Sequence, residues 1–375
     1  MLKNIIENFS APDSRFRGAP FWAWNSRLEL DELRRQIKIM HEMGLGGFFM
    51  HARVGLDTPF LGKEWFEAVK MCISEAEKLG MTAYLYDEDR WPSGSAGGMV
   101  TKNKEYRIQA IAMTTVLLDD PEAVYLGSFA VDNDGIPESW HKTAPETPGR
   151  VLHFYTRHSP PESWYNDQTY LDTLNPDAVK AFIKTAYEPY ADKFQDKFGT
   201  SAGAIFTDEP NYRTALFSEN AKTVVLPGEE PPPPPQILPW TRKLPELFRE
   251  KFNYDILEHL PELFYSLNGE DFSRVRRDYY EMLTTMFVNS FAGQIGKWCS
   301  EHHIPLTGHM HWEDTLTCQR HQVGAAMRSY EYMQMPGVDM LTEHWQIYDT
   351  VKQCVSVAAQ LDKKWRLTEC YGCTG

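Results

Sequence analysis

Short apolar runs alternate with amphipathic segments from the beginning of the chain. After the aromatic run 21–25, four apolar residues recur three and four positions apart: Leu30, Leu33, Ile37 and Met40. This spacing places them on one face of a helix, because about 3.6 residues make one turn. Gly44 and Gly46 are expected to end that helix, and a second apolar run follows at 47–51. The pattern predicts a strand, a helix and a strand in succession.

The same alternation continues along the chain. Seven apolar runs are expected to be strands: 21–25, 47–51, 81–86, 203–207, 305–309, 338–342 and 365–369. The amphipathic segments expected to be helices are 30–40, 64–79, 175–198, 244–252 and 273–302. Alternating strands and helices predict an α/β fold with a parallel sheet and right-handed crossovers. The sequence therefore predicts one catalytic (β/α)₈ TIM barrel over residues 1–375, truncated after its seventh strand. An open doubly wound sheet is the rival, but no Gly-x-Gly-x-x-Gly follows the first strand.

Two stretches interrupt the alternation. Three segments within about 104–165 look extended and are separated by turn-forming residues, which predicts a small antiparallel β insertion after the third strand. The alternative for this stretch is a long loop without a sheet of its own. After the fourth strand, a polar loop of about 212–243 contains five consecutive prolines, Pro231–Pro235. Such a run favours a stiff polyproline segment at the surface.

Composition and charge limit the classes of function. The 375 residues are 42% hydrophobic and 13% aromatic, which suits a packed core and argues against disorder. Lys and Arg number 38 against 52 Asp and Glu, a net charge of −14 that would repel nucleic acid. No apolar run reaches the roughly 20 residues that a membrane span needs. Residues 1–17 lack a signal-peptide core and the six cysteines are scattered, so we expect a cytoplasmic protein with reduced thiols.

Residues that can bind a polar ligand follow all seven expected strands. The chemistry of a barrel lies at the carboxyl ends of its strands, so these residues would share one rim. Any one of them alone is more often a helix cap or a surface ion pair, whereas seven occupied strand ends favour a binding site. The rim tryptophans could also stack on the apolar face of a sugar. The candidate substrate-binding residues are Trp24, Asn25, His51, Arg53, Asp87, Asp89, Arg90, Trp91, Asp208, His309, His311, His344 and Tyr371.

Two carboxylates stand out among the strand ends. Glu209 follows the fourth strand and Glu369 ends the seventh, so they would lie across the barrel mouth from each other. Strand alternation puts Asp208 and Glu209 on opposite sides, so that one acid could face the axis while the other braces a loop. Glycoside hydrolysis uses such a pair, with one acid protonating the leaving oxygen and one carboxylate on the opposite side of the sugar. The alternative for Glu209 is a cap on the following turn.

Other chemistry-bearing patterns carry less weight. His309 and His311 form a His-x-His pair, but no carbamylated lysine or second histidine pair is apparent, which argues against zinc. Asp87, Glu88 and Asp89 could hold a hard cation such as Ca²⁺ or simply solvate a loop. The sequence therefore requires no cofactor.

Several segments resemble a known family. Pro-Phe-Trp-Ala-Trp-Asn at 20–25, Tyr-Asp-Glu-Asp-Arg-Trp-Pro-Ser-Gly at 86–94 and Phe-Thr-Asp-Glu-Pro at 206–210 resemble glycoside hydrolases of family 106 and their unclassified relatives, whose founding activity is α-L-rhamnosidase. The resemblance runs from about residue 20 to 375 and implies a catalytic TIM barrel. It implies Glu209 as general acid, Glu369 as partner carboxylate and Glu343 as a further active-site acid. It also admits a Ca²⁺ ion near the sugar. The third-strand motif is more acidic here than in rhamnosidases.

The sequence thus predicts a glycosidase of carbohydrate metabolism. It would cleave a terminal glycosidic bond of an oligosaccharide or glycoside, rhamnosides first, with no nucleic-acid or membrane partner. The alternatives are a non-catalytic carbohydrate-binding barrel and a metal-dependent hydrolase that uses His51, His309 and His311. The stereochemistry stays open between two readings. Acids at strands four and seven are typical of many retaining barrels, whereas the family resemblance favours inversion with Glu369 as base. The oligomeric state cannot be predicted.

Overall fold

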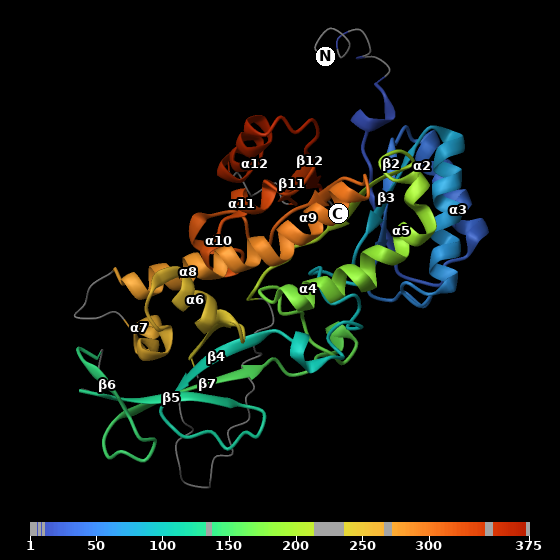
Figure 1. Ribbon diagram of the computed structural model, residues 1–375. Coiled ribbons are helices and arrows are strands. Elements are labelled where there is room, and N and C mark those ends of the chain that lie inside the picture. The colour runs from blue at the N-terminus through green and yellow to red at the C-terminus, as the bar shows by residue number, and fades with distance from the viewer. Residues whose placement is uncertain are drawn as a thin grey trace.

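A computed structural model describes residues 6, 9, 12–132, 137–213, 236–265, 272–341 and 348–372 of the protein. These residues form one parallel and one antiparallel sheet, surrounded by helices (Figure 1). The parallel sheet has the strand order β1-β2-β3-β8-β10-β11-β12. Its strands are β1 (Phe21–Trp24), β2 (Gly47–Ala52), β3 (Thr82–Tyr86), β8 (Ala202–Thr207), β10 (Leu306–Gly308), β11 (Met335–Met340) and β12 (Leu367–Cys370). All seven predicted strands are present, and their parallel pairing is confirmed.

The parallel sheet is strongly curled. The ring centroids of Phe21 on β1 and Phe206 on β8 are only 4.8 Å apart, although β2 and β3 lie between these strands. In a flat sheet three strand spacings would separate them by about 14 Å. Phe49, Tyr86 and Leu367 join the same apolar cluster, so side chains from five strands meet on the concave face. The sheet is therefore part of a barrel, with β1 and β12 at the two edges of the described strands.

Helices cover the outside of this sheet because each carries one apolar face. In α2, the buried residues are Leu33, Ile37 and Met40, at helical spacing. The helix α3 ends at Gly80, whose φ of 65° is the left-handed conformation that glycine adopts without strain. Figure 1 shows α2, α3 and α5 around the β2–β3 side of the sheet. The α-helices are α2 (Leu30–Glu42), α3 (Lys63–Leu79), α4 (Pro176–Phe182), α5 (Glu188–Phe194), α6 (Leu244–Phe252), α7 (Leu260–Phe264), α8 (Arg274–Phe287), α9 (Gly293–Glu301), α10 (Leu316–Gln322), α11 (Ala326–Tyr330) and α12 (Tyr348–Gln360).

Two long predicted helices each contain a π-helical turn. The helix predicted at 175–198 consists of α4, the π turn η4 (Ile183–Tyr187), α5 and a 3₁₀ turn. The helix predicted at 273–302 consists of α8, the π turn η8 (Val288–Ala292) and α9. Such turns occur often at functional sites. The 3₁₀ turns are η1 (Ser14–Phe16), η2 (Lys104–Tyr106), η3 (Ser163–Tyr165), η5 (Gln195–Lys197) and η6 (Ile256–Glu258).

The antiparallel sheet forms the end of the molecule away from α2 and α3 (Figure 1). Its order is β6-β5-β7-β4-β9, with strands β4 (Gln109–Thr114), β5 (Val124–Val131), β6 (Trp140–Thr143), β7 (Val151–His158) and β9 (Gln236–Trp240). The three extended segments predicted there do pair in antiparallel fashion. The fifth strand, β9, corrects the prediction of a loop at residues 236–240, because it pairs with β4 and ends in the buried Trp240. The pentaproline Pro231–Pro235 lies outside the described residues.

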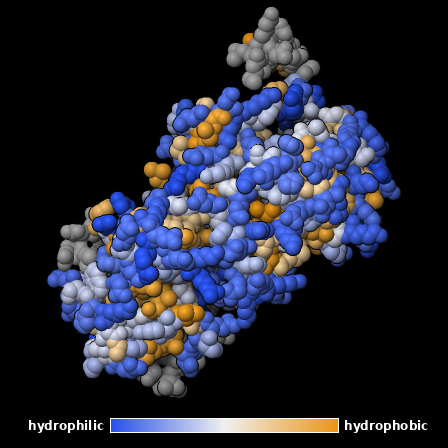
Figure 2. Space-filling model, in the orientation of Figure 1, coloured by the Kyte–Doolittle hydropathy of each residue, from blue (hydrophilic) through white to orange (hydrophobic). Residues whose placement is uncertain are grey.

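The surface in Figure 2 is mainly hydrophilic, with apolar side chains in small patches. This agrees with the high content of charged residues, 24% of the chain. Among the helices in the described part of the chain, none is both long and apolar enough to span a membrane.

Candidate active site

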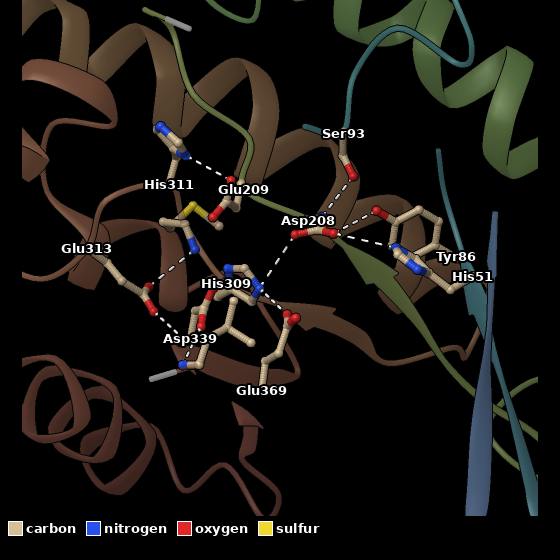
Figure 3. A network of polar contacts seen from close by, with 12 residues as sticks. His51, Tyr86, Ser93, Asp208, Glu209, His309, His311, Glu313, Asp339 and Glu369 are labelled. Carbon is tan, nitrogen blue, oxygen red and sulfur yellow. Dashed lines mark hydrogen bonds and ion pairs between the residues drawn. The ribbon is translucent and has the colours of Figure 1, made fainter. Parts of the chain in front are cut away.

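The candidate site is a cluster of acids and histidines beyond the carboxyl ends of the parallel strands (Figure 3). Asp208, directly after β8, lies at its centre and is only 6% exposed. The Tyr86 hydroxyl donates a 2.6 Å hydrogen bond to Asp208 Oδ2. The Nε2 atoms of His51 and His309 lie 3.7 Å and 3.5 Å from the two carboxylate oxygens. Burial alone would raise the pKa of Asp208, but the two histidines outweigh it and hold this pKa below its usual value.

Glu209 belongs to a second pair. Its Oε2 lies 3.0 Å from Nδ1 of His311, and the glutamate side chain is 20% exposed. The φ of Glu209 is 47°, which is rare for a residue with a side chain and ends the alternation of the strand. Asp208 and Glu209 therefore both reach the cluster, instead of pointing to opposite sides as predicted.

His309 links Asp208 to the last strand. Its Nε2 lies 2.7 Å from Oε2 of Glu369, and the ring is 1% exposed. Burial disfavours a charged imidazole, yet the hydrogen bond to Glu369 and the charge of Asp208 prevail and raise the pKa of His309 well above its usual value. The Glu369 side chain is 17% exposed, so it can meet a ligand from solvent. Asp208, His309 and Glu369 thus form a hydrogen-bonded and ion-paired chain across four strands.

Glu313 holds the ends of β10 and β11 together. Its two oxygens accept hydrogen bonds from the backbone N–H groups of Met310, at 3.2 Å, and Asp339, at 2.7 Å. The Tyr330 hydroxyl donates a third hydrogen bond, at 2.5 Å. Burial raises the pKa of Glu313 to about 7. This carboxyl group fixes the backbone that directly follows His309 and connects it to β11.

Asp339 brings a further acid to the cluster. It precedes the last residue of β11, and its partner on β12 is Glu369. Burial raises the pKa of Asp339 to about 6, with the charges of Glu369 and Glu209 contributing in the same direction. Asp339, like Glu313, is therefore an acid of the cluster whose charge changes closer to neutral pH than that of an ordinary carboxyl group.

The loop after β3 supports the cluster from the side. The Ser93 hydroxyl donates a 2.5 Å hydrogen bond to Asp87 and accepts one of 2.8 Å from the backbone N–H of Asp208. The other oxygen of Asp87 accepts a 2.6 Å hydrogen bond from Tyr187, a residue of the π turn η4. Burial raises the pKa of Asp87 to about 7. Asp87 is therefore a buried support for Ser93, rather than a rim residue that binds substrate.

Glu88 fixes the rest of this loop. It is 1% exposed and accepts hydrogen bonds from five backbone N–H groups of the loop. Asp89, in turn, receives a 3.0 Å hydrogen bond from Asn166. The three acids Asp87, Glu88 and Asp89 are thus bound by different protein groups, and the Ca²⁺ site suggested for them by the sequence stays a prediction.

The other predicted substrate-binding residues have varied positions. Trp24 is 2% exposed and packs on Trp65 with a 5.0 Å centroid distance, so its expected contact with ligand is corrected to a core role. Asn25 is exposed at the end of β1. Arg53 lies over the ring of Trp91 at 4.9 Å.

Arg90 is tied to the loop around η3 by its 2.8 Å hydrogen bond to Asn166. Tyr371, just past β12, is 78% exposed. Glu343 and His344 lie outside the described residues and stay predictions.

Five residues that position or extend the cluster were not predicted: Tyr86, Ser93, Tyr187, Glu313 and Asp339. Tyr86 and Asp339 lie inside expected strands, where the alternation rule could have assigned them to the same face as Asp208 and Glu369. Tyr187 and Glu313 act across elements far apart in sequence, so no local pattern marks them.

Two overlapping sets of side chains could hold a divalent cation. They are Asp208 with His309 and Glu369, and Glu209 with His309 and Asp339, and within each set the ligand atoms lie within 4.8 Å of one another. Each set offers one imidazole and two carboxylates, a donor set that suits transition metals better than Ca²⁺. His51 and His311 approach Asp208 and Glu209, respectively, so the three histidines proposed for a metal hydrolase do not share one set.

The arrangement can carry out acid–base chemistry at a rim open to solvent. Two partly exposed carboxylates, Glu209 and Glu369, each contact one histidine from the end of β10. The buried Asp208, with the Tyr86 hydroxyl and His309 beside it, holds these groups in position.

Comparisons with known proteins agree with the fold. The sequence matches no protein-family profile and no curated protein sequence. A solved structure of a rhamnosidase from Novosphingobium sp. PP1Y is similar, with a TM-score of 0.64 and 14% sequence identity. The match covers 97% of this chain and 52% of the rhamnosidase, so the chain spans about half the length of that protein. At this identity the similarity concerns the fold.

Proposed function

We propose that the protein is a glycoside hydrolase that cleaves a terminal glycosidic bond. The observation that carries the proposal is the placement of Glu209 and Glu369 after β8 and at the end of β12. Their side chains are 20% and 17% exposed, whereas that of Asp208 between them is 8% exposed. Two accessible carboxylates that flank one rim are what hydrolysis of a glycoside requires.

In the proposed reaction Glu209 is the general acid. Its proton passes to the glycosidic oxygen as the bond to the anomeric carbon breaks, and the alcohol leaves. Glu369 takes a proton from a water molecule whose oxygen bonds to the anomeric carbon, which yields the free sugar with inverted configuration. Asp339, whose pKa burial raises to about 6, lies within reach of Glu209 and limits the charge that accumulates there.

The proposed substrate class is the α-L-rhamnosides. Two independent observations support it: the sequence motifs around Trp91 and Glu209 resemble those of rhamnosidases, and a rhamnosidase shares the fold over 97% of this chain. The departure in the third-strand motif concerns residues that the structure assigns to loop support, namely Asp87 and Glu88.

A screen of 4-nitrophenyl glycosides tests the function. We expect release of 4-nitrophenol from the α-L-rhamnoside by the unmodified protein, and strongly reduced release by Glu369→Gln. Glu67→Gln, an exposed glutamate of α3, is the matched control and should retain full activity. Saccharide binding without any turnover would instead favour a carbohydrate-binding barrel. Turnover that requires bound metal would favour a metal-dependent hydrolase.

A further inference from the structure

Trp312 is an exposed aromatic residue next to the proposed general acid. It follows His311 in the segment after β10, and 54% of its surface is exposed. Most other tryptophans of the described chain are more buried; Trp24, Trp65 and Trp240 are among the largest buried side chains. The position of Trp312 in the molecule therefore differs from that of a core tryptophan.

Contacts connect Trp312 to one member of the acid pair. The rings of Trp312 and His311 are stacked, with centroids 5.5 Å apart and an interplanar angle of 19°. His311 Nδ1 in turn lies 3.0 Å from Glu209 Oε2. Glu369 contacts a different histidine, His309. Trp312 thus lies on the Glu209 side of the cluster.

The backbone of Trp312 is strained. Its φ of 47° is unfavourable for a bulky residue and is usually adopted by glycine or asparagine. Glu209, at the end of the neighbouring strand, has the same φ. Residues in such conformations cluster at functional sites, where the surrounding structure maintains them. A half-exposed ring gains little from burial that would offset this strain, so a role toward a ligand is the better explanation.

We propose that the Trp312 indole is a stacking surface for the ring of the leaving group. This inference rests on the proposed function, since a general acid lies beside the oxygen that the leaving group carries away. A ring attached to that oxygen would lie beyond Glu209, on the side where His311 holds the indole. The ligand it fits is a pyranose with an apolar face or an aromatic aglycone, and an acyclic alkyl group would gain little from it.

The test compares two substrates whose leaving groups are both alkoxides, benzyl and methyl α-L-rhamnoside, or the same pair of whichever sugar the screen identifies. Trp312→Ala should lower kcat/KM for the benzyl glycoside by about fivefold to tenfold more than for the methyl glycoside, in line with the strength of aromatic stacking. Trp312→Phe keeps a ring and should recover most of this selectivity. Trp365→Phe, before β12 at the opposite end of the strands, is the matched control and should leave the ratio unchanged.

A stability measurement separates a ligand role from a structural one. Trp312→Gly relieves the left-handed conformation, so its Tm should equal or exceed that of the unmodified protein while the benzyl selectivity is lost. Equal losses on both substrates, or a lower Tm for Trp312→Gly, would overturn the inference and leave the proposed function intact. Failure of the unmodified protein to cleave any glycoside would instead refute the proposed function, and the inference with it.

Discussion

Asp208 and Glu209 are neighbours in sequence but have separate tasks in the site. Asp208 is buried, accepts a hydrogen bond from the Tyr86 hydroxyl and lies beside two histidines. It therefore maintains the charge and position of the cluster. Glu209 is accessible because its backbone departs from the strand conformation. The sequence could identify both acids as strand-end residues, but it could not predict a φ of 47° at a glutamate. A positive φ is rare for a residue with a side chain, so local preferences argue against it.

Asp87 gives a pH-dependent prediction at the same scale. Its pKa is raised to about 7 by burial, against an ordinary value of 3.8. Between these values the folded protein keeps a proton that the unfolded chain has lost, so the contribution of Asp87 to stability falls as pH rises. Asp87→Asn should abolish this loss of stability with rising pH, because an asparagine side chain does not titrate. Both partners of Asp87 are hydroxyl groups, which can also accept a hydrogen bond from the amide.

Urea unfolding at pH 5 and pH 8 measures the effect. At each pH, the free energy of unfolding of the unmodified protein is subtracted from that of Asp87→Asn. This difference should be about 1–3 kcal/mol larger at pH 8 than at pH 5, since one pKa unit corresponds to about 1.4 kcal/mol. Asp192→Asn, at an exposed position of α5, is the control and should show no such change. The same difference at both pH values would contradict the protonated state assigned to Asp87.

Among the elements, β11 shows where the sequence pattern was misread. The strand was predicted at 338–342, which leaves out Pro336 and Gly337. Both residues lie inside β11 and pair with its neighbours. A Cβ at Gly337 would lie 2.6 Å from the carbonyl oxygen of Gly308, so glycine is needed for close contact between strands. The strand ends at Met340, so Asp339 lies at its carboxyl end.

The loop at 88–98 gives a second element-scale prediction. Both carboxylate oxygens of Glu88 accept hydrogen bonds from backbone N–H groups. In Glu88→Gln the NH₂ group replaces one of these oxygens. In either orientation of the amide, this NH₂ group therefore faces backbone donors and cannot accept their hydrogen bonds. We expect a loss of about 1–3 kcal/mol in the free energy of unfolding, the typical cost of an unmet buried polar group. Faster hydrogen exchange in residues 93–97 should accompany it, measured by mass spectrometry. Glu67→Gln, at an exposed position of α3, is the control. Unchanged stability and exchange would refute this role of Glu88.

The positions of β8 and β12 bear on the stereochemistry. Glu209 contacts His311 while Glu369 contacts His309, so the two acids reach the cluster through different side chains. The family resemblance favours inversion, in which a water molecule lies between sugar and base and the carboxyl groups are about 6.5–9.5 Å apart. We expect ¹H NMR to show that the sugar released first has the inverted anomeric configuration. Retention would make Glu369 the nucleophile.

At the scale of the whole molecule, periodicity accounts for most of the architecture. Seven strands, their order along the chain and the main helices follow from alternating apolar patterns that local geometry imposes. The addition of β9 to the antiparallel sheet could not be predicted, because the pairing partner β4 is more than a hundred residues earlier in the sequence. The curl of the sheet is equally nonlocal. It brings Asp208, His309 and Glu369 together from strands that are not all neighbours.

The whole protein also allows a test of metal dependence. We expect dialysis against EDTA to leave both glycosidase activity and Tm unchanged, because the ion pair of His309 with Asp208 and Glu369 already balances part of the charge of the cluster. Elemental analysis of the purified protein by mass spectrometry provides the control. A stoichiometric transition metal, with activity lost on its removal and restored on its return, would contradict this expectation.

The central claim is that Glu209 supplies the proton in glycoside cleavage, and the dependence on leaving group tests it most directly. The measurement is kcat/KM of the unmodified protein and of Glu209→Gln for methyl α-L-rhamnoside and for 2,4-dinitrophenyl α-L-rhamnoside. The methyl glycoside needs a proton to leave, so its kcat/KM should fall by about 10²–10⁴-fold. The dinitrophenyl glycoside needs none, so its kcat/KM should fall far less. Equal losses on the two substrates would contradict the assignment of Glu209 as the general acid.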